Sequence, residues 1–220
     1  MQKQKMILAS SSPRRREMIS WMGIPFETIS ADIDESRRSH ELPLEMVRRL
    51  AREKTERIAE NRSDSIILAA DTIVIKGDQI LGKPIDSEQA GQMLRDLRGE
   101  IHQVATAISL IIPTQQRMFD MCISNVKMRN YSDDEIDDYI KSGDPLDKAG
   151  AYAIQNRTFN PVPDFSGCFA SVMGFPFCHI ERNLRKIDGY NWISTAVICL
   201  KHLHYNCPIY KRVLDGEDIG

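Results

Sequence analysis

Three arginines stand at the start of an expected helix, where their charge opposes the helix dipole. The stretch "SSSPRRR", residues 10–16, directly follows the apolar run "MILA". A Ser followed by Pro13 is typical of a helix that begins at the Pro. Helix N-termini disfavour cations by about 0.3–1 kcal/mol each. Arg14 and Arg15 therefore predict a bound anion, to which Ser10 and backbone N–H groups would add hydrogen bonds. A surface helix with solvated arginines is the alternative.

Two charged residues fall on positions that the hydrophobic pattern assigns to the core. Lys54 shares one helical stripe with four apolar residues: Leu44, Val47, Ala51 and Ile58. An amine there must extend to water or meet an anion. Asp71 interrupts the apolar stretch "SIILAADTIVI", where a cation or metal would keep it ionised. Asp71 is therefore a candidate for holding a metal ion or activating water, with a structural ion pair as the alternative.

Further candidates lie in two short loops. "ADIDES" supplies Asp32, Asp34 and Glu35 after an expected strand, and Mg²⁺ takes one or two such carboxylates together with substrate phosphates. Lys83 in "LGKP" follows an expected hairpin and could reach a phosphate. A solvated acidic loop and an ordinary surface lysine are the alternatives. The chain has no Gly-rich Walker sequence, which excludes a P-loop.

The cysteine and histidine residues give weaker indications of a metal or catalytic site. The stretch "CLKHLHYNC" contains Cys199, His202, His204 and Cys207, a zinc set by residue type, but its members are more crowded than zinc-finger ligands. No Cys–His or Ser–His–Asp nucleophile is indicated. His102 is expected to be a structural hydrogen-bonding group.

Composition narrows the class of protein. The 220 residues are 42% hydrophobic and 27% charged, which is typical of a soluble globular protein. A net charge of −2 argues against a nucleic-acid binder. No stretch approaches the roughly 18–20 apolar residues of a membrane span, and the N-terminal apolar run is too short for a signal peptide. Five cysteines without a secretion signal predict reduced thiols and a cytoplasmic protein.

Strand and helix patterns alternate along the chain, which predicts an α/β class with a mixed sheet. Strands are expected at 5–10, 24–30, 65–75, 79–82, 102–112, 117–129, 149–155 and 167–174. Helices are expected at 13–22, 42–60, 87–97, 132–143, 176–187 and 193–205, with a polar tail over about 203–220. Ser132 and Glu135 form a capping-box signature for the fourth of these helices.

Several segments together resemble the Maf family of nucleoside triphosphate pyrophosphatases. They are "ILASSSPRRREMI", "DIDES", "RLAREK", "LAADTIVI", "ILGKP", "GEIHQVATAISL" and "DKAGAYAIQ", in order over residues 6–180. The resemblance implies a single two-lobed α/β domain over residues 1–220, with a central cleft, related to the inosine triphosphate pyrophosphatase architecture. It also implies hydrolysis of a nucleoside triphosphate to the monophosphate and pyrophosphate with Mg²⁺ or Mn²⁺, and it makes a homodimer plausible.

The resemblance also implies a set of site residues. The family's site falls on Ser10, Arg14, Arg15, Glu35, Lys54, Asp71, Lys83 and Gln155. Glu35 and Asp71 are then the metal ligands, with Asp71 orienting or deprotonating the water. Lys54 and Lys83 complete the catalytic set and hold the triphosphate with Arg14 and Arg15, while Thr72 and Gln155 meet the base or sugar.

The arginine pair, Thr72 and "AYAIQ" resemble the branch that acts on dTTP and UTP. The branch that prefers 7-methyl-GTP has Gln where Thr72 stands. The sequence departs from the family pattern at Arg98, Ala107 and Asn156, and "GCFASVMGFP" stands where "GSYxNVVGLP" is typical. The later departures cluster near Gln155, so they affect the expected preference for a base more than the expected chemistry at the phosphates. A nucleotide-binding regulator of cell division (septum formation) without turnover is the alternative function.

Overall fold

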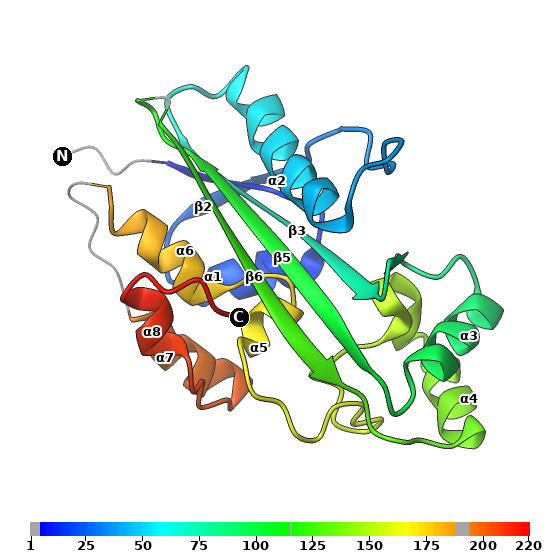
Figure 1. Cartoon of the computed structure of the whole chain (residues 1–220). Coiled ribbons are helices and arrows are strands. Elements are labelled where there is room, and N and C mark those ends of the chain that lie inside the picture. Colours follow the sequence, from blue (N-terminus) through cyan, green and yellow to red (C-terminus); the bar gives the residue numbers. More distant parts are fainter. Residues whose placement is uncertain (1–4, 115, 188–193) are drawn as a thin grey trace.

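A mixed β-sheet with strand order β2-β1-β3-β5-β6 runs through the protein, and a short β4 pairs with β3 (Figure 1). The structure, a computed structural model, describes residues 5–114, 116–187 and 194–220. The strands are β1 (Met6–Ala9), β2 (Phe26–Ile29), β3 (Ile66–Lys76), β4 (Gln79–Leu81), β5 (Ile101–Ile111) and β6 (Arg117–Lys127). β1 is parallel to β2 and β3, whereas β3, β5 and β6 are antiparallel neighbours. The predicted α/β class with a mixed sheet is confirmed.

Helices lie on both faces of this sheet (Figure 1). They are α1 (Pro13–Ser20), α2 (Pro43–Ala59), α3 (Ser87–Leu97), α4 (Asp133–Lys141), α5 (Phe169–Val172), α6 (Phe177–Leu184), α7 (Thr195–Ile198) and α8 (Tyr210–Leu214). The sequence signals for the N-termini of α1 and α4 are confirmed. Ser12 accepts a hydrogen bond from the backbone of Arg15 at the start of α1, and Ser132 and Glu135 form the predicted capping box of α4.

Successive β3 residues point to opposite faces of the sheet, as the pleat requires. Ile73 and Ile75 pack with Val47 and Ala51 of α2 on one face. Ala70 and Val74 belong to the main core on the other face, together with residues of α1, α3, α5 and α6. Asp71 therefore points toward α2, whereas Thr72 points toward the main core.

One edge of β3 is partly open. β1 pairs with residues 66–68 of β3 and β4 pairs with residues 74–76, while β5 occupies the opposite edge throughout. Residues 69–73 consequently have no strand partner on the first edge within the described part of the chain. Asp71 and Thr72 lie in this gap, close to the carboxyl ends of the parallel strands β1 and β2, where α/β proteins commonly bind ligands.

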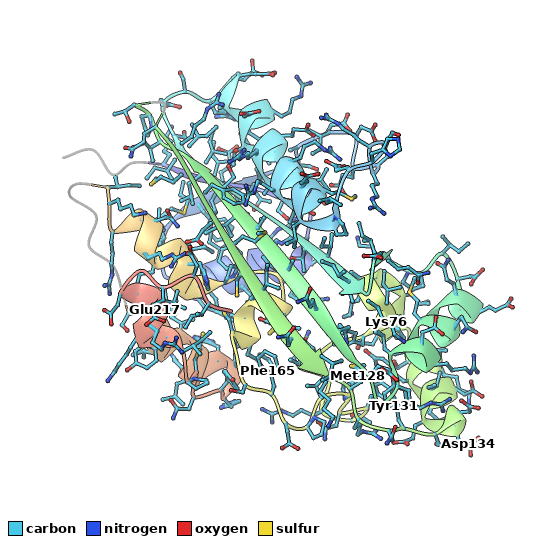
Figure 2. All side chains as sticks on the ribbon, in the orientation of Figure 1. Lys76, Met128, Tyr131, Asp134, Phe165 and Glu217 are labelled. Atoms are coloured by element: carbon cyan, nitrogen blue, oxygen red, sulfur yellow. The ribbon has the colours of Figure 1, made fainter. Side chains whose placement is uncertain are left out.

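The side-chain view shows how the outer helices lie around the sheet (Figure 2). Lys76, Met128 and Tyr131 lie at the end of the sheet beside α3 and α4, whereas Glu217 lies beside α8, on the side of the molecule that carries α6 and α7. α8 falls within the predicted polar tail, where it contacts α6 and buries Val213. No helix among residues 5–114, 116–187 and 194–220 is long and apolar enough to cross a membrane.

Two predicted strands are wrong. Residues 149–151 form a 3₁₀ turn in the segment expected as a strand at 149–155, and α5 replaces the strand expected at 167–174. Gly150 and Gly174 adopt φ of 70° and 95°, which an extended strand does not allow. The backbone N–H of Ala153 donates to the Tyr139 hydroxyl at 3.0 Å, where a strand would offer a carbonyl. Short apolar runs alone do not distinguish a strand from other buried segments.

His102 is buried in β5, and its Nε2 lies 2.8 Å from the Tyr152 hydroxyl, which confirms the structural role expected for it. Its Nδ1 is buried without a hydrogen-bond partner. Burial, followed by the charge of Lys76, lowers the pKa of His102 to about 4. The folded protein therefore holds a neutral imidazole well below the usual histidine pKa of about 6.5.

This burial predicts a loss of stability in mild acid. Between about pH 6.5 and pH 4 the unfolded chain binds a proton that folded His102 does not, so stability falls as the pH falls. The unfolding free energy of the wild type should fall between pH 7 and pH 4.5, and in His102→Gln this fall should be smaller by about 2 kcal/mol. Urea unfolding at several pH values would measure the fall in both proteins. His40→Gln, at an exposed position, is the control, and equal effects of the two substitutions would contradict the prediction.

Candidate active site

Lys54 joins two carboxylates from separate segments. It extends from α2 and is 7% exposed, and its Nζ lies 2.5 Å from Asp71 Oδ1 on β3. The same Nζ lies 2.8 Å from Glu35 Oε1, in the loop that follows β2. The lysine on the apolar stripe of α2 therefore meets anions and does not extend to water. Its burial is compatible with its charge because both carboxylates compensate it.

Two further cationic side chains, Arg15 and Lys83, act electrostatically on Glu35. Burial alone would raise the pKa of Glu35, but the hydrogen bond and charge of Lys54, with the charges of Arg15 and Lys83, lower it below the usual value. Lys83 itself is exposed in the loop after β4. Segments after β1, β2 and β4 thus bring opposite charges to the open edge of β3.

Arg15 binds the opposite face of the same strand. Its Nη2 donates to Thr72 Oγ1 at 2.9 Å, and its Nε donates to the carbonyl of Gly174 at 3.0 Å. Thr72 Oγ1 also lies 2.9 Å from Thr106 Oγ1, and the Thr106 hydroxyl donates to the carbonyl of Ser171 at 2.8 Å. This chain of hydrogen bonds joins α1, β3 and β5 to the α5 turn.

Burial lowers the pKa of Arg15, and the neighbouring charge of Arg14 lowers it further, while Asp71 and Glu35 act in the opposite direction. Electrostatics therefore couples the two faces of β3. Arg14 makes no hydrogen bond or ion pair with the described residues, which leaves its guanidinium available to a ligand.

Ser10 and Gln155 are placed differently. Ser10 is buried, and its Oγ accepts the backbone N–H of Ser12 at 3.1 Å, so its own O–H remains able to donate. Gln155 Oε1 is buried without a hydrogen-bond partner. No hydrogen bond or ion pair of the described residues joins either of them to Lys54 or Asp71. The direct contacts thus unite Glu35, Lys54 and Asp71 only.

Asn156, a departure from the family pattern beside Gln155, has a structural role. Its Oδ1 accepts the backbone N–H groups of Thr158 and Phe159 at 3.1 and 2.8 Å, and its Nδ2 donates to Asp144 Oδ2 at 3.1 Å. Asp144 also accepts the hydroxyl of Tyr139 at 2.6 Å. These bonds hold the turn that carries Gln155.

Sequence reasoning missed Thr106 and Gly174. Thr106 is the register partner of Thr72 across β3 and β5, and only the strand register could have revealed it. Gly174 carried no signal beyond its residue type. The stretch from Cys199 to Cys207 forms no cluster of metal ligands among the described residues, and His202 stacks instead on Trp21 at 4.8 Å between ring centroids.

A cavity of about 590 Å³ lies elsewhere, around the edge strand β6. Its lining includes Arg48 of α2, Asp120 of β6, Arg182 of α6 and the chain end at Gly220, and it includes none of the predicted site residues. The predicted site therefore depends on the charged groups at the β3 edge and not on this cavity.

Gly174 tests the bond network beneath Arg15. A Cβ at this position would lie 3.0 Å from Thr72 Oγ1 and 3.5 Å from Arg15 Nε, at a φ of 95°. We expect Gly174→Ala to lower the free energy of unfolding by about 1–3 kcal/mol, because it combines backbone strain with displacement of the Thr72 hydroxyl that binds Arg15. Gly77→Ala is the matched control, since φ is 59° there and no atom lies within 4 Å of the added Cβ. Denaturant unfolding should show the larger loss for Gly174→Ala, and a smaller or equal loss would refute the steric role.

Comparison with known proteins identifies the family. The profile of the Maf family, described as "Maf-like protein", matches residues 5–187. A dTTP/UTP pyrophosphatase of Hahella chejuensis is 43% identical over 193 residues, covering 86% of this chain and 96% of that protein. A dTTP/UTP pyrophosphatase of Dictyoglomus thermophilum is 36% identical over 191 residues, covering 86% and 98%.

Among solved structures, a nucleoside-triphosphatase / dITP/XTP pyrophosphatase of Mycobacterium abscessus superposes with a TM-score of 0.41 and 13% identity, over 57% of this chain and 74% of that one. The family assignment does not depend on it. The profile match extends from β1 to the end of α6, and the curated relatives align over nearly their whole length. This protein is therefore a member of the Maf family.

Proposed function

We propose that the protein hydrolyses dTTP and UTP to the nucleoside monophosphate and pyrophosphate. The observation that carries this proposal is the Lys54 ammonium held between Asp71 and Glu35 at the open edge of β3. The relatives named dTTP/UTP pyrophosphatase, at 36–43% identity, support the same activity. Their names describe an enzyme and do not favour a regulator without turnover.

The donor set fits a divalent cation such as Mg²⁺ or Mn²⁺. Glu35 and Asp71 offer carboxylate oxygens, the ligands that hard cations prefer. Both carboxylates contact one positive group, Lys54 Nζ, so this place already accommodates a cation between them. When bound, the metal would supply positive charge to the phosphate oxygens.

Four cationic side chains would hold the triphosphate. Arg14 is free of protein partners among the described residues, and Lys83 is exposed. The orientations of Lys54 and Arg15 are fixed by their contacts within the protein. Fixed donors placed where charge develops stabilise the departing pyrophosphate without reorganisation at the moment of reaction. Ser10, through its free O–H, would donate to a phosphate oxygen.

Asp71 is suited to act on the attacking water. Its Oδ1 accepts the bond from Lys54, whereas its Oδ2 accepts no hydrogen bond from a described residue. Oδ2 would take a proton from water as the water oxygen bonds to the α-phosphorus. The bond between the α-phosphorus and the bridging oxygen then breaks, and pyrophosphate leaves with the bonding electron pair. Lys54 positions Asp71 through its hydrogen bond to Oδ1.

Gln155 is the better candidate for reading the base. Thymine and uracil present an N–H donor between two carbonyls, and the buried, unpartnered Oε1 of Gln155 would accept that N–H. The hydroxyl of Thr72 is already engaged by Arg15 and Thr106. Thr72 is therefore a positioning residue for Arg15 in this proposal.

The protein is also proposed to act in the cytoplasm, which its five free and buried cysteines support. The homodimer and the absence of nucleic-acid binding stay predictions.

Asp71→Asn tests the reaction. With dTTP, UTP and a panel of other nucleoside triphosphates in Mg²⁺, we expect release of pyrophosphate by the wild type and a loss of at least about 10²-fold in kcat for the variant. Asp78→Asn, at an exposed hairpin position, is the matched control and should keep full turnover. A thermal unfolding scan would verify that Asp71→Asn is folded. Release of orthophosphate by the wild type, or near-normal turnover by folded Asp71→Asn, would disprove the assignment.

A further inference from the structure

Three potential metal ligands meet on the face of β6 opposite α2. Cys122 lies on β6, Cys168 immediately precedes α5, and His179 lies on α6; β6 contacts both of these helices (Figure 1). Cys122 and His179 are 0% exposed and Cys168 is 5% exposed. One ligand atom from each lies within 4.8 Å of the other two. None of the three belongs to the proposed active site.

The two ring nitrogens of His179 have different environments. Nε2 lies 3.1 Å from the carbonyl oxygen of Ile219, and a carbonyl only accepts, so Nε2 carries the proton and donates. In the neutral ring Nδ1 then holds a lone pair, and this atom is buried without a partner. Histidines that bind metals typically donate their other N–H to a backbone carbonyl in this way.

A second unpartnered atom lies beside the same group. Ser171 Oγ is buried without a hydrogen-bond partner in the structure. The Ser171 carbonyl accepts the hydroxyl of Thr106, and Thr106 is the register partner of Cys122 across β5 and β6. Buried polar atoms without a hydrogen-bond partner are costly, and a ligand bound here would satisfy them.

The cysteines favour a cation. Cys122 and Cys168 place two buried sulfur ligands beside the imidazole of His179. A bound cation would displace the thiol protons, because the thiolate is the form of cysteine that binds metal. Cys168 stands where the family pattern has Ser, so the pair of thiols is a feature of this chain.

We propose that Cys122 Sγ, Cys168 Sγ and His179 Nδ1 bind one thiophilic divalent cation of the zinc class, with Ser171 Oγ beside the remaining coordination position. Zinc binds sulfur at about 2.3 Å and histidine nitrogen at about 2.0–2.1 Å. Tetrahedral geometry then sets the ligand atoms roughly 3.5–3.8 Å apart, a contraction of about 1 Å from the widest spacing here. Thiolate and imidazole ligands select zinc over magnesium, whereas the carboxylates of the proposed active site have the opposite preference.

The site would stabilise the turn beneath Arg15. It ties Cys168, the residue before α5, to β6 and α6. From the same short segment, Ser171 and Gly174 offer the carbonyls that bind Thr106 and Arg15. The segment after α8 takes part as well, because Ile219 fixes the orientation of His179. The bound cation thus has a structural role and is separate from the cation proposed for catalysis.

Anaerobic titration of the full chain with Co²⁺, in excess Mg²⁺ to saturate carboxylate sites, tests the proposal. We expect about one Co²⁺ per chain with a thiolate-to-cobalt charge-transfer band and tetrahedral d–d bands, all abolished by Zn²⁺. Cys122→Ser, Cys168→Ser and His179→Gln should each weaken binding at least about tenfold. Cys199→Ser removes a buried thiol outside the group and should leave the spectrum unchanged.

A second measurement serves if a variant does not fold. In the wild type, Zn²⁺ should slow alkylation of Cys122 and Cys168, located by peptide mapping, while Cys199 reacts at an unchanged rate. The proposal is overturned by the absence of a charge-transfer band, by a Cys168→Ser variant that binds Co²⁺ as tightly as the wild type, or by loss of the band in Cys199→Ser. It is also overturned if chain purified under reductant and without oxygen contains a Cys122–Cys168 disulfide. Pyrophosphatase assays do not enter this test, so its outcome is independent of the proposed function.

Discussion

A lysine ammonium packed between a helix and a sheet keeps its charge only if anions lie beside it, because the interior solvates charge poorly. Lys54 meets this requirement through Asp71 and Glu35, at 2.5 and 2.8 Å. Removing either carboxylate would leave a buried charge less compensated. The loop after β2 must therefore approach β3, and α2 must lie across the sheet where it does. The position of the proposed catalytic groups follows from this single electrostatic constraint.

The open edge of β3 explains how two faces of a sheet can serve one site. Within a paired strand, Asp71 and Thr72 would lie on opposite sides of a continuous layer. Between the segments paired with β1 and β4, no neighbouring strand separates them on that edge. Arg15 is bound to Thr72 on one face, and its pKa nonetheless responds to Asp71, which faces α2. The gap in pairing would therefore let charges on both faces act on the proposed nucleotide ligand.

The segment beyond the family profile is joined to the part of the fold that the profile matches by charge as well as by packing. Arg182 of α6 binds Asp120 of β6 and, in the same region, Asp218 and the carbonyl of Glu217. These contacts hold the chain end against the edge of the sheet. Asp120 is buried, so loss of Arg182 would remove the charge partner of a buried carboxylate, whereas the pair with the exposed Asp218 contributes less. The same segment carries Ile219, which contacts His179.

The sequence by itself determined the elements whose signals are local. The sequence predicted the start of α1, the capping box of α4 and the β3–β4 hairpin. It also predicted that Lys54 and Asp71 are charged residues at positions that face the interior. These predictions were possible because helices and strands repeat at 3.6 and 2 residues and caps act within one turn. Only the tertiary structure decided which distant groups meet: Thr72 with Thr106, Arg15 with Gly174, and Cys122 with Cys168 and His179. It also decided that residues 149–155 and 167–174 form turns and α5. Strand register and the packing of buried segments depend on contacts across the whole chain, which no local periodicity encodes.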